Sequence, residues 1–192
     1  MRTVLQIVDD FLPNPDVVRN TVISQGFKDE KFEDTIYHTV NADYLPSDIP
    51  VGLCRLFNKS VNIHVAAFRQ GKVGSPIHNV VHADNTCASL ASVLYLNPTP
   101  APGSGTAFWK HKVTGWDQQP TEDQLREANL TIEGFCADWH KLEAWEMVTL
   151  TGAKYNRLII YPTVKFHSRW PLDGFGETDE SARLVHCAFF DL

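Results

Sequence analysis

The sequence lacks the marks of several protein classes. It has no apolar run long enough to cross a membrane, and the apolar residues before Asp9 and Asp10 are too few for a secretion signal. Its four cysteines form no CxxC pair, which argues against a zinc knuckle and against a dense disulfide framework. Lysine and arginine are scattered and the formal net charge is -6, so no basic surface for nucleic acid is expected. We therefore expect a cytoplasmic protein with no membrane and no nucleic acid among its partners.

The sequence does have the length and composition of an ordinary globular domain. Its 192 residues are 43% hydrophobic and 21% charged, and glycine and proline are spread along the chain. No internal repeat interrupts this pattern. We expect one domain over residues 1–192.

Apolar periodicity and turn residues predict many short strands behind one or two helices. Asn14 and Pro15 begin an amphipathic helix that ends at Gly26, and a second helix is expected over residues 53–61. Residues 31–50 are of mixed character and contain proline, which indicates a loop with short strands. Further strands are expected over residues 5–11, 61–70, 82–97, 106–111, 156–162, 165–170 and 182–192. This order indicates an α+β fold, mostly β, with a jelly-roll or cupin-like double sheet.

The order of the predicted strands also indicates a hairpin and a helical insert. The stretches 82–97 and 106–111 predict a hairpin, because a turn-rich segment joins them. Residues 114–146 are polar, helix-forming and rich in tryptophan, and we interpret them as a helical insert between strands. Inserts of this kind often cover a site.

His82 and Asp84 are candidate metal ligands. They are two residues apart in a segment that we interpret as a strand or strand edge, where side chains at i and i+2 point to the same face. A third ligand from a later strand would complete a set of two imidazoles and one carboxylate with open coordination positions. That set is typical of non-haem Fe(II) oxygenases. Alone, an H-x-D motif is a weak signal, since most such pairs are polar neighbours near a turn.

Arg183 is a candidate anion-binding residue. It begins a terminal strand in which Val185, Cys187 and Phe189 share its face. A guanidinium on an otherwise apolar face needs an anion, which is either the carboxylate of a ligand or an internal Asp or Glu. His167 lies sixteen residues before it, just after the strand over residues 156–162.

Six short motifs together resemble the iron(II)/2-oxoglutarate-dependent oxygenases, particularly their prolyl-4-hydroxylase-like branch. In order, they are H-A-D (82–84), VLYLN (93–97), GTAFW (105–109), NRLIIYP (156–162), FHS (166–168) and ARLVHCAFF (182–190). The similarity covers about residues 76–192, and the opening VDDFLPNPDVVRN is similar to the N-terminal helix region of small members. The sequence departs from many relatives at Val185, where they have serine or another polar residue, and some relatives have lysine as the anchor.

The resemblance implies a double-stranded β-helix core over about residues 61–192, with N-terminal helices over about residues 1–60 packed on the sheet. It implies that His82, Asp84 and His167 bind Fe(II), and that Arg183 binds the distal carboxylate of 2-oxoglutarate. The implied reaction uses dioxygen, converts 2-oxoglutarate to succinate and hydroxylates an unactivated C–H bond. The substrate would be a small molecule or an amino-acid residue.

Several other residues are candidates for this site or for its surroundings. Tyr95 and Tyr161 are candidates for hydrogen bonds to the co-substrate, although buried tyrosines with a structural partner are at least as common. Arg157 is the alternative anchor for the carboxylate. His78 is expected to be structural or to support a ligand. Four further histidines, His64, His111, His140 and His186, are expected to be structural or exposed. The five tryptophans, expected to fill a core or line a cleft, are Trp109, Trp116, Trp139, Trp145 and Trp170.

Two other functions stay open on the sequence alone. A cupin-type metalloenzyme would use the same three ligands without 2-oxoglutarate. A non-catalytic β-sandwich binding module would have His82 and Asp84 as structural residues and the aromatic insert as its recognition surface. The substrate and the oligomeric state, including a homodimer, are also left open.

Overall fold

The computed structural model describes residues 5–32, 35–39, 44–75, 80–84 and 88–192, and it is mostly β, as expected. The strands are β1 (Gln6–Val8), β2 (Lys28–Phe32), β3 (Thr35–Thr39), β4 (Asn62–Gly71), β5 (Leu90–Tyr95), β6 (Gly105–His111), β7 (Trp145–Gly152), β8 (Leu158–Pro162), β9 (His167–Trp170) and β10 (Arg183–Asp191). The helices are α1 (Pro15–Gln25), α2 (Asp48–Phe57), α3 (Glu122–Glu127) and α4 (Ile132–Cys136), with 3-10 turns η1 (Ala137–His140) and η2 (Leu142–Ala144).

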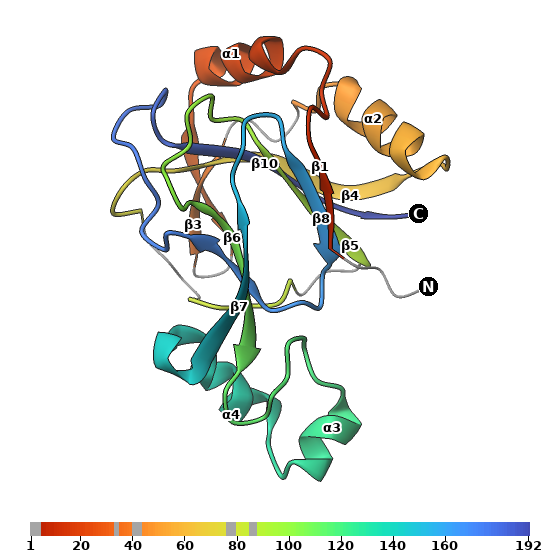
Figure 1. Cartoon of the computed structure of the whole chain (residues 1–192), viewed down its shortest axis with the longest axis vertical. Helices are drawn as coiled ribbons and strands as arrows, with labels where there is room; N and C mark the ends of the chain where they lie inside the picture. The colour runs from red at the N-terminus through yellow and green to blue at the C-terminus, as the bar shows by residue number, and fades with distance from the viewer. Residues whose placement is uncertain (1–4, 33–34, 40–43, 76–79, 85–87) are drawn as a thin grey trace.

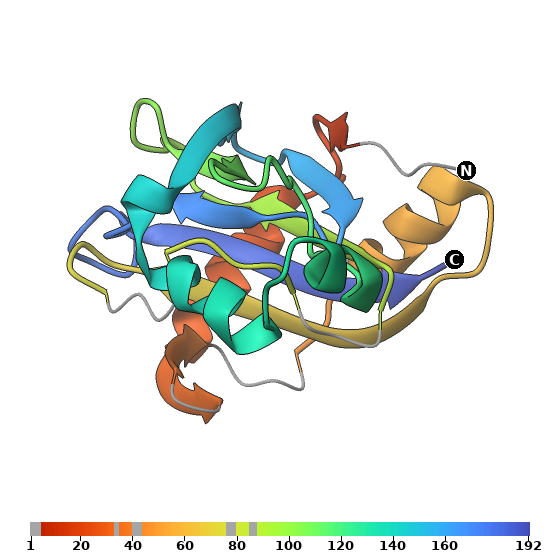
Figure 2. The same ribbon diagram turned by 90° about the horizontal axis from the view of Figure 1, so that it is seen from below.

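These strands form two antiparallel sheets (Figure 1). The larger has seven strands in the order β1-β8-β5-β10-β4-β3-β2, and the smaller has three in the order β7-β6-β9. The long central strands β10 and β4 run side by side from Arg183 opposite Gly71 to Asp191 opposite Asn62 (Figure 2). Residues before position 60 therefore supply not only helices but also strands at both edges of the large sheet.

Helices α1 and α2 pack on the outer face of the seven-stranded sheet (Figure 1). Helix α1 begins at Pro15 and is followed by Gly26 at φ 70°, a conformation that glycine adopts at little cost, so both predicted ends are confirmed. Helix α2 begins at Asp48, five residues earlier than the sequence predicted. Pro50 lies in its first turn, where the missing N–H has no intrahelical partner to lose.

Alternation along β10 separates the two faces of the large sheet. Leu184 and Phe190 belong to the core beneath the helices, whereas Val185 packs with residues that face the smaller sheet. Val185 lies directly opposite Arg69 of β4 and Tyr95 of β5. Directly opposite residues of paired strands share a face, so these three side chains point toward the inner face of the sheet.

The predicted hairpin between residues 82–97 and 106–111 is wrong. Strand β5 pairs with β8 on one side and β10 on the other, so it has no free edge for β6. Strand β6 instead lies in the smaller sheet between β7 and β9. The turn-rich segment between them therefore carries the chain from one sheet to the other.

The predicted helical insert is present as α3, α4, η1 and η2, at the opposite end of the molecule from α1 and α2 (Figure 1). Its Leu125 and Phe135 pack with Trp109, Trp145 and Phe166 in a separate core cluster, and the other three tryptophans pack against it.

In the part of the chain that the structure describes, no helix has both the length and the apolar character needed to span a bilayer.

Candidate active site

The backbone brings His82 and His167 face to face. The His82 amide donates to the His167 carbonyl oxygen over 3.1 Å, and the His167 amide donates to that of His82 over 2.8 Å. The Asp84 amide donates to Thr163 O over 2.9 Å, so residues 82–84 follow the chain that leads from β8 into β9. His82 forms only an isolated bridge and β5 begins at Leu90, so the strand predicted over residues 82–97 does not include His82 or Asp84.

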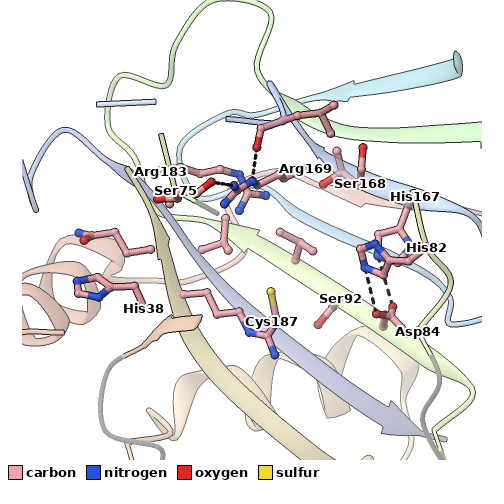
Figure 3. A pocket seen from close by; sticks show the side chains of 18 of the residues that line it. His38, Ser75, His82, Asp84, Ser92, His167, Ser168, Arg169, Arg183 and Cys187 are labelled. Carbon is pink, nitrogen blue, oxygen red and sulfur yellow. Dashed lines mark hydrogen bonds and ion pairs between the residues drawn. The ribbon is translucent and has the colours of Figure 1, made fainter. Parts of the chain in front are cut away.

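The three predicted ligands converge. Single ligand atoms of His82, Asp84 and His167 all lie within 4.8 Å of one another, and the two imidazole centroids are 4.5 Å apart (Figure 3). Asp84 Oδ1 is 3.9 Å from His82 Nε2, and Asp84 Oδ2 is 3.5 Å from His167 Nε2. His167 Nδ1 lies 2.9 Å from the Lys165 carbonyl oxygen. A carbonyl accepts only, so Nδ1 carries the proton and Nε2 presents its lone pair toward Asp84.

The environment of Asp84 suits a cation. Burial raises the pKa of its carboxyl group, while the neighbouring His167 and Arg69 act in the opposite direction. Asp84 Oδ2 is buried and has no hydrogen-bond partner among the described residues. A buried carboxylate oxygen is costly without a cation or a donor. Two imidazole nitrogens and one carboxylate match the donors that Fe(II) and similar divalent ions accept.

A cavity of about 450 Å³ lies against these residues and extends over the inner face of the large sheet. Arg183 lines it and is largely buried, with its guanidinium carbon 6.0 Å from the centre of the Tyr95 ring. No described carboxylate lies within ion-pair distance of Arg183, so the internal partner that the sequence left open is not found among the described residues. Figure 3 shows Arg169 beside Arg183 at the end of the cavity away from His82 and Asp84.

Arg169 is held by backbone carbonyl groups. Its Nε donates to Leu172 O over 2.5 Å, and its Nη2 donates to Ser75 O over 2.7 Å. Burial, together with the charge of Arg183, lowers the pKa of Arg169 to about 10, so it remains a cation at neutral pH. Gly71 makes room for it, since a Cβ at this position would lie 3.1 Å from Arg169 Nη1.

The two candidate tyrosines have different positions. Tyr161 lines the cavity with its ring 4.8 Å from that of His167, and burial raises its pKa well above the usual range, so it stays a neutral hydroxyl. Tyr95 does not line the cavity. Its hydroxyl forms a 2.7 Å hydrogen bond with Thr106 Oγ1, and burial raises its pKa to about 12. Tyr95, expected to contact the co-substrate, is therefore placed outside the cavity lining, with its ring beside the Arg183 guanidinium.

Arg157, the alternative anchor that the sequence suggested, does not line the cavity. Its Nε lies 2.6 Å from Asp9 Oδ1, and its Nη1 donates to Gly152 O over 2.9 Å, outside the residues that line the cavity. Its guanidinium holds the pKa of the Asp9 carboxyl group well below the usual range. The carboxylate of Asp9, directly after the end of β1, therefore neutralises the charge of Arg157.

Two arginines of the cavity, Arg69 and Arg169, were not predicted from the sequence. The sequence offered a signal for Arg69, because this charged residue follows the alternating segment VNIHVAAF.

His78 lies outside the described residues. None of the described residues of the insert, and none of the tryptophans, lines the cavity. Among the other histidines, His64 pairs with Asp191, His111 lies near Asp138, His140 is exposed, and His186 is buried on the helix side of the sheet.

Comparison with known proteins gives a family and a fold. The model of the Family of unknown function (DUF6445) matches residues 1–170. No curated protein sequence matches the chain. Similar crystal structures include AviO1 from Streptomyces viridochromogenes Tue57, with a TM-score of 0.60 at 9% identity, covering 100% of this chain and 90% of AviO1.

Two further structures have the same fold. One is an oxidoreductase of the 2OG-Fe(II) oxygenase family from Burkholderia pseudomallei, with a TM-score of 0.57 at 8% identity, covering 97% of this chain and 85% of that one. The other is HygX from Streptomyces hygroscopicus with nickel, 2-oxoglutarate and hygromycin B bound, with a TM-score of 0.54 at 9% identity. That match covers 97% of this chain and 82% of HygX. The overall architecture is thus that of 2OG-Fe(II) oxygenases.

Proposed function

The chain belongs to the family of unknown function DUF6445, and we propose that it is an Fe(II)- and 2-oxoglutarate-dependent oxygenase that hydroxylates an unactivated C–H bond. The observation that carries this proposal is the convergence of His82, Asp84 and His167 at one end of a cavity that has Arg183 at its other end. The fold shared with 2OG-Fe(II) oxygenases supports it, and so does the binding of a metal and 2-oxoglutarate by HygX.

In this proposal His82, Asp84 and His167 hold Fe(II) through two imidazole nitrogens and a carboxylate. Lys165 O fixes the His167 ring, which keeps its Nε2 lone pair directed at the ion. The buried Asp84 carboxylate gains the counter-charge that its surroundings lack. The bound metal, with 2-oxoglutarate and dioxygen, supplies the oxidising chemistry that forms succinate and carbon dioxide and hydroxylates the substrate.

The residues at the other end of the cavity bind the co-substrate. Arg183 presents its planar guanidinium to the distal carboxylate of 2-oxoglutarate, a geometry that permits two parallel hydrogen bonds. Arg169 adds positive charge at the same end. The Tyr161 hydroxyl remains protonated and is available as a hydrogen-bond donor near the metal. The apolar residues Val93 and Val185 line the space between and limit the entry of water.

The proposal also covers the fold of the domain, the branch of the superfamily, the substrate class, the location and the oligomeric state. The two sheets would be the halves of a double-stranded β-helix in one oxygenase domain over residues 1–192, in the prolyl-4-hydroxylase-like branch. The substrate would be a small molecule or an amino-acid residue, the protein would act in the cytoplasm, and a homodimer is compatible with the proposal. Hydroxylation is the proposed outcome, although structures of this fold include the alpha ketoglutarate dependent carbocyclase SnoK and the epimerase SnoN.

The test separates binding from turnover. Metal-free protein is titrated anaerobically with Fe(II) and then with 2-oxoglutarate, and calorimetry and the visible charge-transfer absorption of the chelate are recorded. Labelled 2-oxoglutarate with ascorbate and dioxygen is then followed for succinate. We expect stoichiometric binding of both ligands and slow, iron-dependent succinate formation. Absence of both ligands from the protein would reject the proposal.

The alternative metalloenzyme without 2-oxoglutarate is tested in the same experiment. It predicts metal binding in which 2-oxoglutarate produces neither heat nor absorption. Under the proposed function, Arg183→Gln weakens 2-oxoglutarate binding and leaves the metal in place. Under the alternative, the same variant changes neither measurement.

A further inference from the structure

We propose that the substrate of this site is a small molecule that places an apolar ring or short chain on Phe189 and Val65, with the carbon to be hydroxylated beside the metal. This inference rests on the proposed function and specifies its substrate class. It is carried by a row of side chains that crosses the inner face of the large sheet, from the candidate metal centre to a solvent-exposed valine.

Strand pairing defines this row. Ala91 of β5 lies opposite Tyr161 of β8 and, on its other side, opposite Phe189 of β10. Phe189 in turn lies opposite Val65 of β4. Directly opposite residues point to one face, and Phe189 lies an even number of positions from Val185, which faces the smaller sheet. These residues therefore share the inner face, and we call the following four the cross-strand row: Tyr161, Ala91, Phe189 and Val65.

The cross-strand row begins at the metal centre and ends at solvent. The Tyr161 ring lies 4.8 Å from that of His167, whereas Val65 is 52% exposed. Successive strands of a sheet are about 4.8 Å apart, so the row from β8 through β5 and β10 to β4 is about 14 Å long. Arg183 lies at the other end of β10 from Phe189, so the carboxylate that Arg183 is proposed to bind lies away from the row.

Burial along β10 shows that the row is open to the cavity. Ala188 and Phe190 are fully buried on the helix side of the sheet, whereas Phe189 between them is only half-buried and lines the cavity. Phe189 also packs against the core cluster that contains Ala91, so the sheet holds its ring in place. An apolar group that covers this surface removes it from water, which favours binding.

The surroundings of Phe189 select against polar groups. Cys187 and Ala67 form the next inward pair along the two central strands. Burial raises the pKa of the Cys187 thiol, so the thiol is uncharged at neutral pH. The side chains of alanine, valine and phenylalanine form no hydrogen bonds, so a polar group placed on them would lose its hydration without replacement. A hydrocarbon part of the substrate has no such cost.

The size of the cavity limits this hydrocarbon group. The cavity volume of about 450 Å³ is toward the lower end of the range for small-molecule sites, and the co-substrate must share it. An apolar ring or short chain fits the remaining space along the cross-strand row. On Ala91 and Phe189 that group lies beside the metal centre, where it also keeps water out of the cavity.

The test uses a homologous series of neutral probes and does not need the natural substrate. Protein loaded with Zn(II) and saturating 2-oxoglutarate is titrated with n-alkyl amides from propanamide to heptanamide, and binding is measured by saturation-transfer NMR. Affinity should rise by about threefold to fourfold for each added methylene, as expected for the burial of one CH₂ group. Adipamide, which has an amide at each end, should bind no more tightly than propanamide. A further increase in 2-oxoglutarate should not displace the probes.

Proton relaxation places the bound probe relative to the metal. Mn(II) in place of Zn(II) speeds the relaxation of protons that lie close to it. We expect faster relaxation of the alkyl protons of pentanamide in the Mn(II) protein than in the Zn(II) protein. Equal relaxation in the two proteins would place the probe away from the metal centre and would overturn the inference.

Two substitutions of Phe189 test the inner part of the row. Phe189→Ala should weaken the binding of heptanamide by about tenfold or more, because the phenyl surface is lost. Phe189→Leu keeps an apolar side chain and should retain most of the gain per methylene. Unfolding temperatures without ligand show whether each variant is folded.

Val65 tests the outer part of the row and has a matched control. Val65→Thr keeps the shape of the side chain but replaces a methyl group with a hydroxyl, and it should weaken heptanamide by about threefold while propanamide is unchanged. Val148→Thr makes the same change at a strand valine of similar exposure, 47%, that does not line the cavity. It should leave the whole series unchanged. If Phe189→Ala does not fold, this pair of variants still decides the question.

The outcomes are separable from those of the proposed function. Equal affinities along the amide series, displacement of the probes by 2-oxoglutarate, or equal results for Val65→Thr and Val148→Thr overturn the inference. If metal and 2-oxoglutarate never bind, the proposed function fails. The amide series on metal-free wild type, Val65→Thr and Val148→Thr then still decides whether the cross-strand row binds apolar groups.

Discussion

The peptide groups of His82 and His167 are joined by two reciprocal hydrogen bonds, one from each amide to the other residue's carbonyl oxygen. This pairing holds the two imidazoles next to each other and next to Asp84, although neither His82 nor Asp84 belongs to a strand of the described chain. The geometry of the candidate metal centre is therefore set by main-chain contacts, and the side chains can be replaced one at a time without removing them.

The first prediction concerns these ligands. His82→Ala and His167→Ala should each weaken Fe(II) binding by at least about a hundredfold, since loss of a direct ligand exceeds the effect of losing a residue that only supports one. Metal content after anaerobic dialysis measures this. His140→Ala, at an exposed position in η1, is the control and should bind metal normally. Full metal occupancy in the His167 variant would contradict the proposed centre.

The second prediction distinguishes two arginines that the sequence left as alternatives. Arg183→Gln should weaken 2-oxoglutarate binding by about 10- to 100-fold, the usual effect of losing hydrogen bonds to a charged group. Arg157→Gln should leave that affinity unchanged, because Arg157 is bound to Asp9. Anaerobic titration of the Fe(II) protein gives both values. The opposite result would move the co-substrate away from Arg183.

The third prediction follows from His186, which is buried against Phe68 with ring centroids 4.7 Å apart. Burial lowers its pKa to about 3, below the ordinary value of about 6.5. Between these values the unfolded chain binds this proton and the folded chain does not, so the free energy of unfolding falls as the pH drops. The His186 contribution to this loss is at most several kcal/mol.

Replacement of His186 removes that contribution. His186→Leu should show a smaller decrease in urea midpoint between pH 7 and pH 4 than the wild type does. His140→Leu, which changes an exposed histidine, should follow the wild-type pH dependence. Parallel curves for the wild type and His186→Leu would show that His186 is not the group responsible.

The fourth prediction compares two glycines that face each other in the smaller sheet. A Cβ on Gly105 would lie 2.0 Å from Thr151 O, a contact that only backbone movement relieves, whereas a Cβ on Gly152 meets nothing within 4 Å. Gly105→Ala should lower the free energy of unfolding by about 1–3 kcal/mol or more. Gly152→Ala should be neutral or slightly stabilising. Chemical denaturation measures both, and equal effects would contradict this difference in packing around the two glycines.

Features that depend on neighbouring residues in the sequence were predicted correctly. Pro15 and Gly26 gave both ends of α1, and the motif order around His82, Asp84 and His167 correctly placed side chains that meet in space. Arg183 was found because a charged residue on an apolar face needs a partner, and alternation in a strand shows which face it shares.

The remaining errors come from pairing between distant segments. Whether β5 pairs with β6 or with β10 depends on edges that no local pattern shows, and this is why the predicted hairpin is wrong. Tyr95 and Tyr161 look alike in their strands, yet only Tyr161 faces the cavity, because Thr106 on the other sheet takes the Tyr95 hydroxyl. Arg169 can be assigned to the cavity only once β9 is placed around the same space as β4 and β10.

The double hydrogen bond between His82 and His167 also has a thermodynamic consequence. An ion held by these side chains and Asp84 would cross-link two stretches that are far apart in the sequence, and an unfolded chain offers no comparable set of donors. Its binding free energy would then add to the stability of the whole arrangement of strands between them. Chelation should therefore lower the unfolding temperature of the entire chain and not merely loosen one loop.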